Sequence, residues 1–472
     1  MRFQPFWFDE AITQADIKAA ASAPTHGALD TQVCIIGGGF TGLWTAITLK
    51  KQKPELNIVI IEKDLCGQGA SGRNGGAMLT WSTKFASLIK EFGLEQACFL
   101  VRQSEQAVHD IKAFTNKHGI ECDCRIDGTY YTASNHSQRN AFGPITTLLE
   151  QHQLNAWQTL DKAQLQATGS NANLAGIYSP HAGSVQPAKL VRGLMKVAKT
   201  LGVKVFEHTR YLKHLGQDTL TITTDKGEIR ANQLVFAVNA WLPSLLPQFS
   251  RSVVLVSSDM AITTPAPEKL EAMRLNHGAP VIDARIFVNY YRTTSSGRLM
   301  LGKGGNYFSF NNQVRDTFHR ASCYQAILER SFSHFFAHHQ LEIDRTWTGP
   351  SDRSVSGMPF FGHLNGQANV FYGSGYSGNG VVQSYLGGQI LASLLLNQHN
   401  DWRHCALVNQ TLKQFPVEPF RTAGALMVRN AIRRKESAED NNTPPHKLDV
   451  WLSKLSGSAA KLDPNVKQEY IK

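Results

Sequence analysis

One stretch near the N-terminus, from Val33 to Gly42, constrains the fold of this chain more than any other. Its first four residues are apolar, which is typical of a parallel strand buried on both faces. The glycines that follow fit the pattern G-x-G-x-x-G. In such a pattern Gly37 allows a tight turn, Gly39 lets the backbone approach a pyrophosphate, and Gly42 lets a helix pack on the strand. We expect that helix to begin near Thr41, with its first N–H groups facing the phosphates.

A second apolar run, residues 58–61, ends in Glu62, twenty residues after the last glycine of the pattern. A carboxylate at this position can accept hydrogen bonds from a ribose 2′-hydroxyl group. A glycine pattern alone also fits an ordinary turn, but a strand, a helix, a second strand and an acid in this order predict a dinucleotide-binding unit. At this point NAD and FAD fit equally well.

Size and composition narrow the class of protein. A chain of 472 residues predicts two domains, and 42% hydrophobic residues with 38 glycines are typical of a globular α/β protein. No run of about 18 apolar residues predicts a membrane span, and the first residues lack the apolar core of a signal peptide, so we expect a cytoplasmic protein. Seven cysteines without C-x-x-C spacing predict neither a metal site nor a disulfide framework.

Two further glycine-rich stretches extend the predicted site. Residues 67–76 contain five glycines and the donors Ser71, Arg73 and Asn74, directly after the ribose-binding strand, so we interpret them as a ligand loop rather than a flexible surface loop. Residues 373–380 again fit G-x-G-x-x-G, but no strand ending in an acid follows. We therefore expect a helix N-terminus that faces the same cofactor, rather than a second nucleotide site.

The order of the predicted strands indicates that the dinucleotide domain is discontinuous. Buried strand patterns return after an insertion, whereas alternating β segments between residues 253 and 304 predict a second sheet over the cofactor. The predicted fold is α/β, with a Rossmann-like doubly wound domain and an α+β substrate domain on an antiparallel or mixed sheet. The predicted segments are 1–30 for an N-terminal extension; 31–90, 170–245 and 345–400 for the cofactor domain; 91–169 and 246–344 for the substrate domain; and 401–472 for a C-terminal extension.

Charge leaves the class of partner open. A formal net charge of +11 favours anionic partners, which could be nucleic acid, a membrane surface or small acidic substrates. The C-terminal segment is basic, and its cations could form a solvated helix face or a functional patch; they are Arg421, Arg429, Arg433, Arg434 and Lys435. A polar break is expected from Lys435 to His446.

Taken together, the glycine pattern, Glu62, residues 69–76 and residues 375–381 resemble the FAD-dependent D-amino-acid oxidase superfamily, which includes glycine oxidase and sarcosine oxidase-like enzymes. The resemblance covers about residues 30–400. The Trp-Thr-Gly at 347–349, with Met-Pro-Phe-Phe-Gly at 358–362 and the segment 415–436, is most similar to the branch of γ-glutamylputrescine oxidase and proposed aminophosphonate oxidoreductases.

The resemblance implies that FAD is the cofactor and that three stretches of the chain hold it. The implied FAD-binding residues are Gly37, Gly39, Phe40, Thr41, Gly42, Glu62, Lys63, Ser71, Arg73, Asn74, Gly75, Gly375, Tyr376, Ser377, Gly378, Asn379, Gly380 and Val381. It also implies oxidation of a C–N bond, in which a neutral amine delivers a hydride to flavin N5, the imine hydrolyses, and oxygen or another acceptor reoxidises the flavin. Such chemistry depends on orientation and on desolvation of the amine, so the resemblance implies no catalytic acid or base.

Two departures from the family pattern refine these expectations. Relatives with covalent FAD use a His in the loop or a Cys ahead of the Met-Pro motif, but Arg73 and Gly349 or Pro350 hold those positions here. We therefore expect non-covalent FAD. Glycine-oxidase-like relatives carry a carboxylate-binding Arg four residues after the Trp of Trp-x-Gly, where this chain has Ser351. A simple α-amino acid is therefore a less favoured substrate.

Other side chains could bind an anionic substrate. Arg353, Tyr291 and Arg292 are the candidates, although structural ion pairing explains either arginine equally well. The predicted substrate is a small primary or secondary amine with an anionic group: an aminophosphonate, a γ-glutamylated polyamine or an N-methylated amino acid. The alternative is a flavoprotein that acts on a modified RNA base, which the net charge and the cations between residues 429 and 435 motivate.

Overall fold

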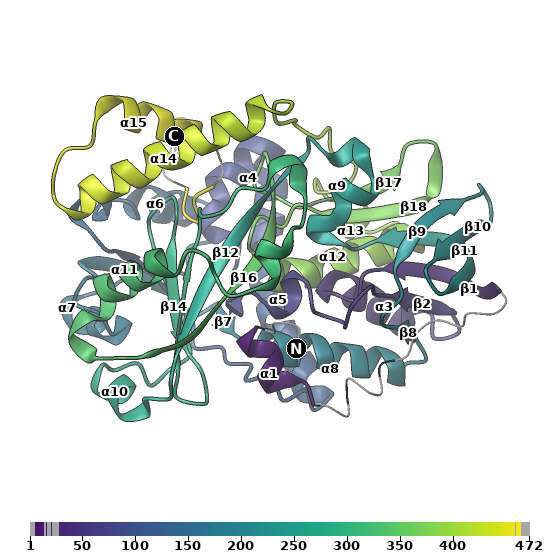
Figure 1. Cartoon of the computed structure of the whole chain (residues 1–472), viewed down its shortest axis with the longest axis horizontal. Helices are drawn as coiled ribbons and strands as arrows, with labels where there is room; N and C mark the ends of the chain where they lie inside the picture. The colour runs from purple at the N-terminus through teal and green to yellow at the C-terminus, as the bar shows by residue number, and fades with distance from the viewer. Residues whose placement is uncertain (1–4, 14–15, 17–19, 21–27, 458, 464–472) are drawn as a thin grey trace.

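Two eight-stranded sheets form the framework of the chain and lie on opposite sides of the molecule in Figure 1. The computed structural model describes residues 5–13, 16, 20, 28–457 and 459–463. No helix within these described ranges combines the length and the apolar character that a membrane crossing needs.

The first sheet contains the predicted dinucleotide unit. Its order is β17-β18-β11-β1-β2-β8, and β10 and β9 continue it beside β11. The parallel strands are β1 (Ala28–Ile36), β2 (Ile58–Ile61), β8 (Lys204–Phe206), β11 (Gly227–Phe236) and β18 (Gln367–Ser374). The antiparallel ones are β9 (Tyr211–Leu215), β10 (Leu220–Thr224) and β17 (Phe360–Leu364).

Helices cover one face of this sheet because its strands are apolar on both faces. The helix α3 (Phe40–Gln52) follows the glycine turn, as predicted, and packs against α8 (Pro187–Thr200) and α12 (Gly380–Leu395). The long helix α5 (Leu94–Lys117) packs on α12. The other face packs against the short helix α9 (Leu242–Leu245) and the turn after it.

The second sheet is mixed, as predicted, and its order is β16-β12-β15-β14-β13-β4-β6-β5. Only β13 and β4 pair in parallel within this sheet. An apolar cluster joins it to α10 (Pro267–Ala272) and α11 (Gln325–Phe336). Its strands are β4 (Thr129–Ala133), β5 (Gln158–Thr159), β6 (Ala175–Ser179), β12 (Val253–Thr263), β13 (Val281–Asp283), β14 (Asn289–Thr293), β15 (Leu299–Lys303) and β16 (Ile343–Ser354).

Two strands of the second sheet fall in segments that the sequence assigned to the cofactor domain. The strand β6 pairs with β4 and β5, and β16 pairs with β12 along its whole length. The first residues of the segments 170–245 and 345–400 therefore belong to the second sheet, and the later residues of both segments belong to the first sheet. The remaining elements are α4 (Phe85–Phe92), α6 (Gly143–Gln151), α7 (Lys162–Leu165), α13 (Asp401–His404) and a two-stranded sheet of β3 (Ala77–Met78) and β7 (Gly183–Ser184).

The N-terminal extension begins with a short docked helix. The helix α1 (Phe6–Ala11) buries Trp7 against Trp347 of β16, with the two rings 5.8 Å apart in an edge-to-face contact. The Trp7 indole N–H donates to the carbonyl oxygen of Asn74 at 2.9 Å. This helix therefore supports the 67–76 loop from behind.

After α13, the described part of the C-terminal extension contains the helices α14 (Phe420–Asp440) and α15 (Lys447–Ser453), at the yellow edge of Figure 1. The polar break expected from Lys435 to His446 begins only after Asp440, because α14 continues to that residue. The reason is polar rather than apolar: the buried Glu436 accepts a hydrogen bond from the Phe287 N–H at 3.0 Å, and Asp440 pairs with Arg285 at 2.6 Å. After α15, residues 459–463 return to the start of α4.

Candidate active site

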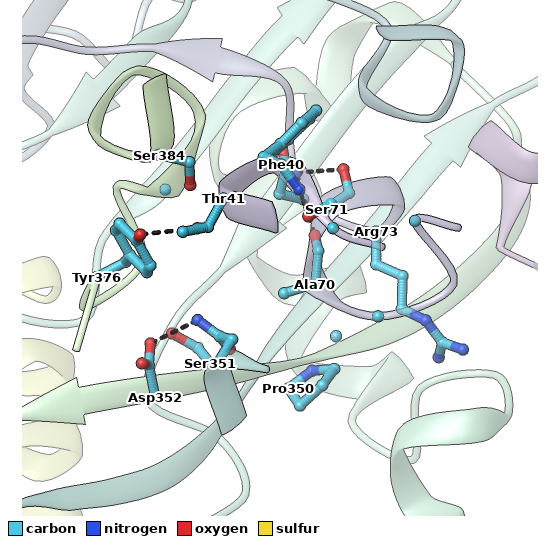
Figure 2. Close-up of a pocket in the computed structure, with 18 of the residues that line it drawn as sticks. Phe40, Thr41, Ala70, Ser71, Arg73, Pro350, Ser351, Asp352, Tyr376 and Ser384 are labelled. Atoms are coloured by element: carbon cyan, nitrogen blue, oxygen red, sulfur yellow. Dashed lines mark hydrogen bonds between the residues drawn. The ribbon is translucent and has the colours of Figure 1, made fainter. Parts of the chain in front are cut away.

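A cavity of about 500 Å³ lies where the two sheets meet. Residues from the end of β1 and the start of α3 line one part of it, and residues from β12, β14 and β16 line another. Figure 2 shows side chains from the start of α3, the 67–76 loop, β16 and the region of α12 around the cavity, from residues about 300 positions apart in the sequence. The cavity therefore depends on the tertiary fold and not on any single motif.

The glycine turn leaves no room for side chains. Gly37 has a positive φ of 110°, and a Cβ atom there would lie 2.4 Å from the carbonyl oxygen of Ala237. A Cβ on Gly42 would lie 2.1 Å from the carbonyl oxygen of Gly37, so α3 can pack closely on β1 only with glycine here. Gly39 and Phe40 line the cavity, and the Phe40 N–H donates to Ser71 Oγ at 2.9 Å.

The acid after β2 lies at one end of the cavity. Glu62 accepts hydrogen bonds from the Gly38 N–H at 2.9 Å and from the Asp64 N–H at 3.0 Å. Burial raises the pKa of Glu62, although both N–H donors act in the opposite direction. Beside it, the Lys63 ammonium lies 4.0 Å from the centre of the Trp241 ring. This end of the cavity thus combines a carboxylate with an aromatic wall.

Residues of the 67–76 loop line the cavity, and the loop contains one 3-10 turn, η1 (Ala70–Gly72). The Arg73 guanidinium points away from the other side chains labelled in Figure 2. It donates to the carbonyl oxygen of Phe318 and, at 2.7 Å, to that of Gln68. The first of these hydrogen bonds connects the loop to the segment around Phe318. Asn74 holds the loop internally by accepting from the Gly76 N–H at 2.8 Å.

The third glycine stretch lines the other end of the cavity and contacts the start of α3. Figure 2 shows Tyr376 facing Thr41, and their hydroxyl oxygens lie 2.7 Å apart. The buried Asp352 carboxylate accepts hydrogen bonds from Ser374 Oγ at 2.8 Å and from the Gly375 N–H. Gly378, at the turn before α12, also lines the cavity. The expected helix N-terminus is therefore present, because α12 begins at Gly380.

Most of the residues that the sequence predicted for the cofactor line this one cavity, although they come from three separate stretches. The lining set comprises Gly37, Gly39, Phe40, Thr41, Glu62, Lys63, Ser71, Arg73, Asn74, Gly75, Tyr376, Gly378, Gly380 and Val381. Four others, Gly42, Gly375, Ser377 and Asn379, lie behind it and shape the backbone.

Two of the three predicted substrate residues do not line the cavity. Tyr291 lies on the opposite face of β14, because side chains alternate along a strand, and its hydroxyl donates to the carbonyl oxygen of Thr168 at 2.7 Å. The buried Arg292 guanidinium donates to the carbonyl oxygens of Gly75 at 2.6 Å and Val185 at 2.7 Å. Arg292 therefore stabilises the end of the 67–76 loop. Arg353 does line the cavity.

The structure also adds lining residues that are not among the predicted site residues. Tyr290 occupies the place expected for Tyr291, and its hydroxyl lies 3.1 Å from Ser258 Oγ. Lys461 reaches the cavity from the C-terminal extension. The alternation of β14 could have identified Tyr290, whereas no pattern in the sequence connects Lys461 with the glycine-rich stretches.

The donor set fits FAD. Two helices, α3 and α12, begin at the cavity, and glycine turns expose backbone at both ends of it, as a pyrophosphate and an aromatic ring system require. No histidine or cysteine is among the described residues that line the cavity. No group of His, Cys, Asp or Glu side chains in the described ranges could hold a metal ion.

Comparisons with known proteins agree with this geometry. The γ-glutamylputrescine oxidoreductase of Escherichia coli is 28% identical over 80% of this chain and 88% of its own length, and a probable oxidoreductase, OrdL, of Haemophilus influenzae is 27% identical over 77% and 82%. The glycine oxidase structure from Geobacillus kaustophilus superposes with a TM-score of 0.68 at 21% identity, over 81% of this chain and 100% of that one. The family described as FAD dependent oxidoreductase matches residues 32–394. This chain therefore belongs to the FAD-dependent oxidoreductase family.

Proposed function

We propose that this oxidoreductase oxidises the C–N bond of a small primary or secondary amine that carries an anionic group. Bound FAD would supply the hydride acceptor, and the resulting imine would hydrolyse. Oxygen or another acceptor would then reoxidise the cofactor. We expect the FAD to be held non-covalently by the glycine turn, the 67–76 loop and the start of α12. The observation that carries the proposal is the position of Arg353.

Arg353 presents a positive charge to the cavity and forms no ion pair with a carboxylate of the described residues. Its guanidinium donates to the carbonyl oxygen of Ala459 at 3.2 Å, and no carboxylate in the described ranges lies within ion-pair distance of it. The neighbouring Asp352 carboxylate accepts hydrogen bonds from Ser374 and Gly375 and offsets the charge of Arg353 only from beyond ion-pair distance. A buried cation without a counter-ion is costly, so an anionic ligand group would be bound favourably there.

The wall beside Arg353 suits the uncharged form of an amine. Tyr290 stands among apolar lining residues, and burial raises the pKa of its phenol to about 12, so it remains a neutral hydroxyl. An apolar wall excludes water, which favours a neutral amine over an ammonium ion. These apolar lining residues are Leu79, Met260, Ile282 and Val288.

Among anionic amines, an aminophosphonate is the sharper proposal, with γ-glutamylated polyamines and N-methylated amino acids as alternatives. The similarity to a protein named γ-glutamylputrescine oxidoreductase supports an amine in general. Ser351 stands where glycine-oxidase-like relatives carry arginine, and Arg353 lies two residues further along β16. This displacement supports an acidic group larger than, or placed differently from, an α-carboxylate.

The basic C-terminal cluster gives the RNA alternative no support, because the chain's own acceptors occupy it. Arg434 pairs with Asp449 at 2.6 Å, and Lys435 pairs with Glu439 at 2.5 Å. Arg429 donates to the carbonyl oxygen of Asn306 at 2.9 Å. These contacts favour a structural role for the cluster over an RNA-binding patch.

An anaerobic panel of amines tests the proposal directly. The purified holoenzyme is mixed with aminophosphonates, γ-glutamylated polyamines and N-methylated amino acids, and bleaching of the visible flavin absorbance is followed. At least one anionic amine should bleach the flavin. Arg353→Gln should weaken the apparent affinity for that amine about 10- to 100-fold, because a charge-assisted hydrogen bond contributes about 1.5–3 kcal/mol.

Two comparisons make this result specific. The exposed Arg139 supplies a matched control, so Arg139→Gln should leave the affinity unchanged. An uncharged analogue of the same amine should be oxidised by the wild type and by Arg353→Gln with similar apparent affinity. The proposal fails if no amine in the panel bleaches the flavin.

A further inference from the structure

The C-terminal extension places a second positive charge beside Arg353. We propose that residues 459–463 form part of the active site, and that Lys461, Arg353 and Ser351 together bind a doubly charged oxyanion group of the ligand, such as a phosphonate. This inference rests on the proposed function for the identity of the ligand. The binding site itself can be tested without turnover.

The three side chains converge on one point. A Cβ atom on Gly378 would lie 3.2 Å from Lys461 Nζ, 3.4 Å from Arg353 Nη2 and 3.7 Å from Ser351 Oγ. Two cations and a hydroxyl group thus surround the same small space. The start of α12, two residues after Gly378, adds the positive end of a helix dipole.

The convergent atoms have only neutral partners or none. Lys461 donates to the side-chain oxygen of Asn379 and lies 3.5 Å from the carbonyl oxygen of Ser377. No carboxylate in the described part of the chain lies within ion-pair distance of its ammonium. Ser351 Oγ is buried and has no hydrogen-bond partner among the described residues. The cluster therefore has donors in excess of acceptors, as an anion-binding site does.

The segment that carries Lys461 is anchored on both sides of this residue. Asp463 pairs with Lys84 at 2.9 Å and accepts from the Ser87 N–H at 2.7 Å. Thr83 Oγ donates to the carbonyl oxygen of Lys461 at 3.0 Å. On the other side, Arg353 itself donates to Ala459. These contacts fix the backbone of residues 459–463 and thereby hold Lys461 at the cavity.

Two positive charges at one point favour a dianion over a monoanion. A singly charged carboxylate would balance one of the two cations and leave the other buried without a counter-ion. A tetrahedral dianion balances both and offers a third oxygen to Ser351 Oγ. Lys84 does not take part, because Asp463 already neutralises it.

Binding of the anion should stabilise the protonated, cationic form of Lys461. Burial lowers the pKa of Lys461, and the charges of Arg353 and Lys84 lower it further. The other ionisable groups nearby are Asp463, paired with Lys84, and Tyr290 and Asp352 beside Arg353. A bound dianion would oppose these effects, so binding should weaken where rising pH deprotonates the lysine.

The test uses sulfate and acetate as probes, because their charges stay constant between about pH 6 and pH 9. Binding to the holoenzyme is measured by titration calorimetry at moderate ionic strength. Sulfate should bind at least 10-fold more tightly than acetate. Lys461→Met should weaken sulfate binding about 10-fold or more, Lys461→Arg should keep it within a few-fold, and the exposed Lys454→Met should leave it unchanged.

Several outcomes would overturn the inference. Equal affinity for sulfate in the wild type and Lys461→Met would do so, as would wild-type enzyme that binds sulfate no more tightly than acetate. If Lys461→Met shifts the midpoint potential of the bound cofactor but leaves sulfate affinity unchanged, the lysine serves the cofactor instead. The comparison of sulfate with acetate in the wild type decides the question even if Lys461→Met fails to fold.

The same measurements separate this inference from the proposed function. Loss of sulfate binding in Lys461→Met, with no amine able to bleach the flavin, would leave the anion site standing and remove the amine proposal. Oxidation of an anionic amine, with sulfate binding unaffected by Lys461→Met, would do the reverse.

Discussion

At the scale of single residues, the close packing of the glycine turn leaves no room for a side chain at Gly42. A Cβ atom on Gly42 would meet the carbonyl oxygen of Gly37 at 2.1 Å, and neither backbone can move without separating α3 from β1. We expect Gly42→Ala to cost about 1–3 kcal/mol or more in the free energy of unfolding and to weaken FAD retention. Thermal unfolding and the flavin-to-protein absorbance ratio measure these two effects.

The matched control for this substitution is Gly424→Ala. Gly424 lies within α14, and a Cβ atom there would meet nothing within 4 Å. Alanine is a better helix former than glycine by about 1 kcal/mol, so this variant should be as stable as the wild type or slightly more stable. A Gly42→Ala protein that keeps its FAD and its melting temperature would contradict the geometry of the turn.

At the scale of elements, the sequence predicts strands and helices better than it predicts which face or which partner a residue takes. The glycine turn and α3 appear where expected, because apolar runs and glycine spacing are local properties. The choice of Tyr291 over Tyr290 was wrong, because the sheet partner that decides which face of β14 is inward lies elsewhere in the chain. The end of α14 was also missed, because Glu436 is held by the backbone of Phe287, which no local pattern reveals.

The attachment of α14 to the second sheet should depend on pH. Burial would raise the pKa of Asp440, but its hydrogen bond and charge interaction with Arg285 outweigh that effect and lower it. A lowered carboxylate pKa stabilises the fold above the ordinary pKa, and this stabilisation is lost as the pH falls through the lowered value. Asp440→Asn should therefore cost about 1–3 kcal/mol at pH 7 and progressively less below about pH 4.

Denaturant midpoints between pH 7 and pH 3 measure this dependence. The exposed Asp218 is a suitable control, since Asp218→Asn should change the stability by less than about 0.5 kcal/mol at every pH. A constant difference between wild type and Asp440→Asn across the range would mean that the ion pair with Arg285 does not stabilise the helix.

At the scale of the whole molecule, the site is an assembly of distant segments, and this limits what the sequence alone could identify. Where the protein backbone must approach a cofactor closely, glycines recur at a fixed spacing in the sequence. The two ends of the cavity could therefore be predicted. A lysine that arrives from residue 461 leaves no such spacing. Its role follows only from the anchoring of residues 459–463 against Thr83 and Ser87, which are nearly 400 positions away in the sequence.

Because residues 37–76, 349–384 and 461 meet only in the folded chain, FAD should bind the folded state and not the unfolded one. Removal of FAD should therefore lower the melting temperature, and FAD at 100 times its Kd should restore about 2.7 kcal/mol of the free energy of unfolding.

Acid precipitation should release the flavin, since neither histidine nor cysteine is among the described lining residues. FMN should stabilise the apoprotein less, because it lacks the adenosine that would reach Glu62. Flavin that stays with the precipitated protein would contradict non-covalent binding, and equal melting temperatures with and without FAD would contradict a cofactor site built by the whole fold.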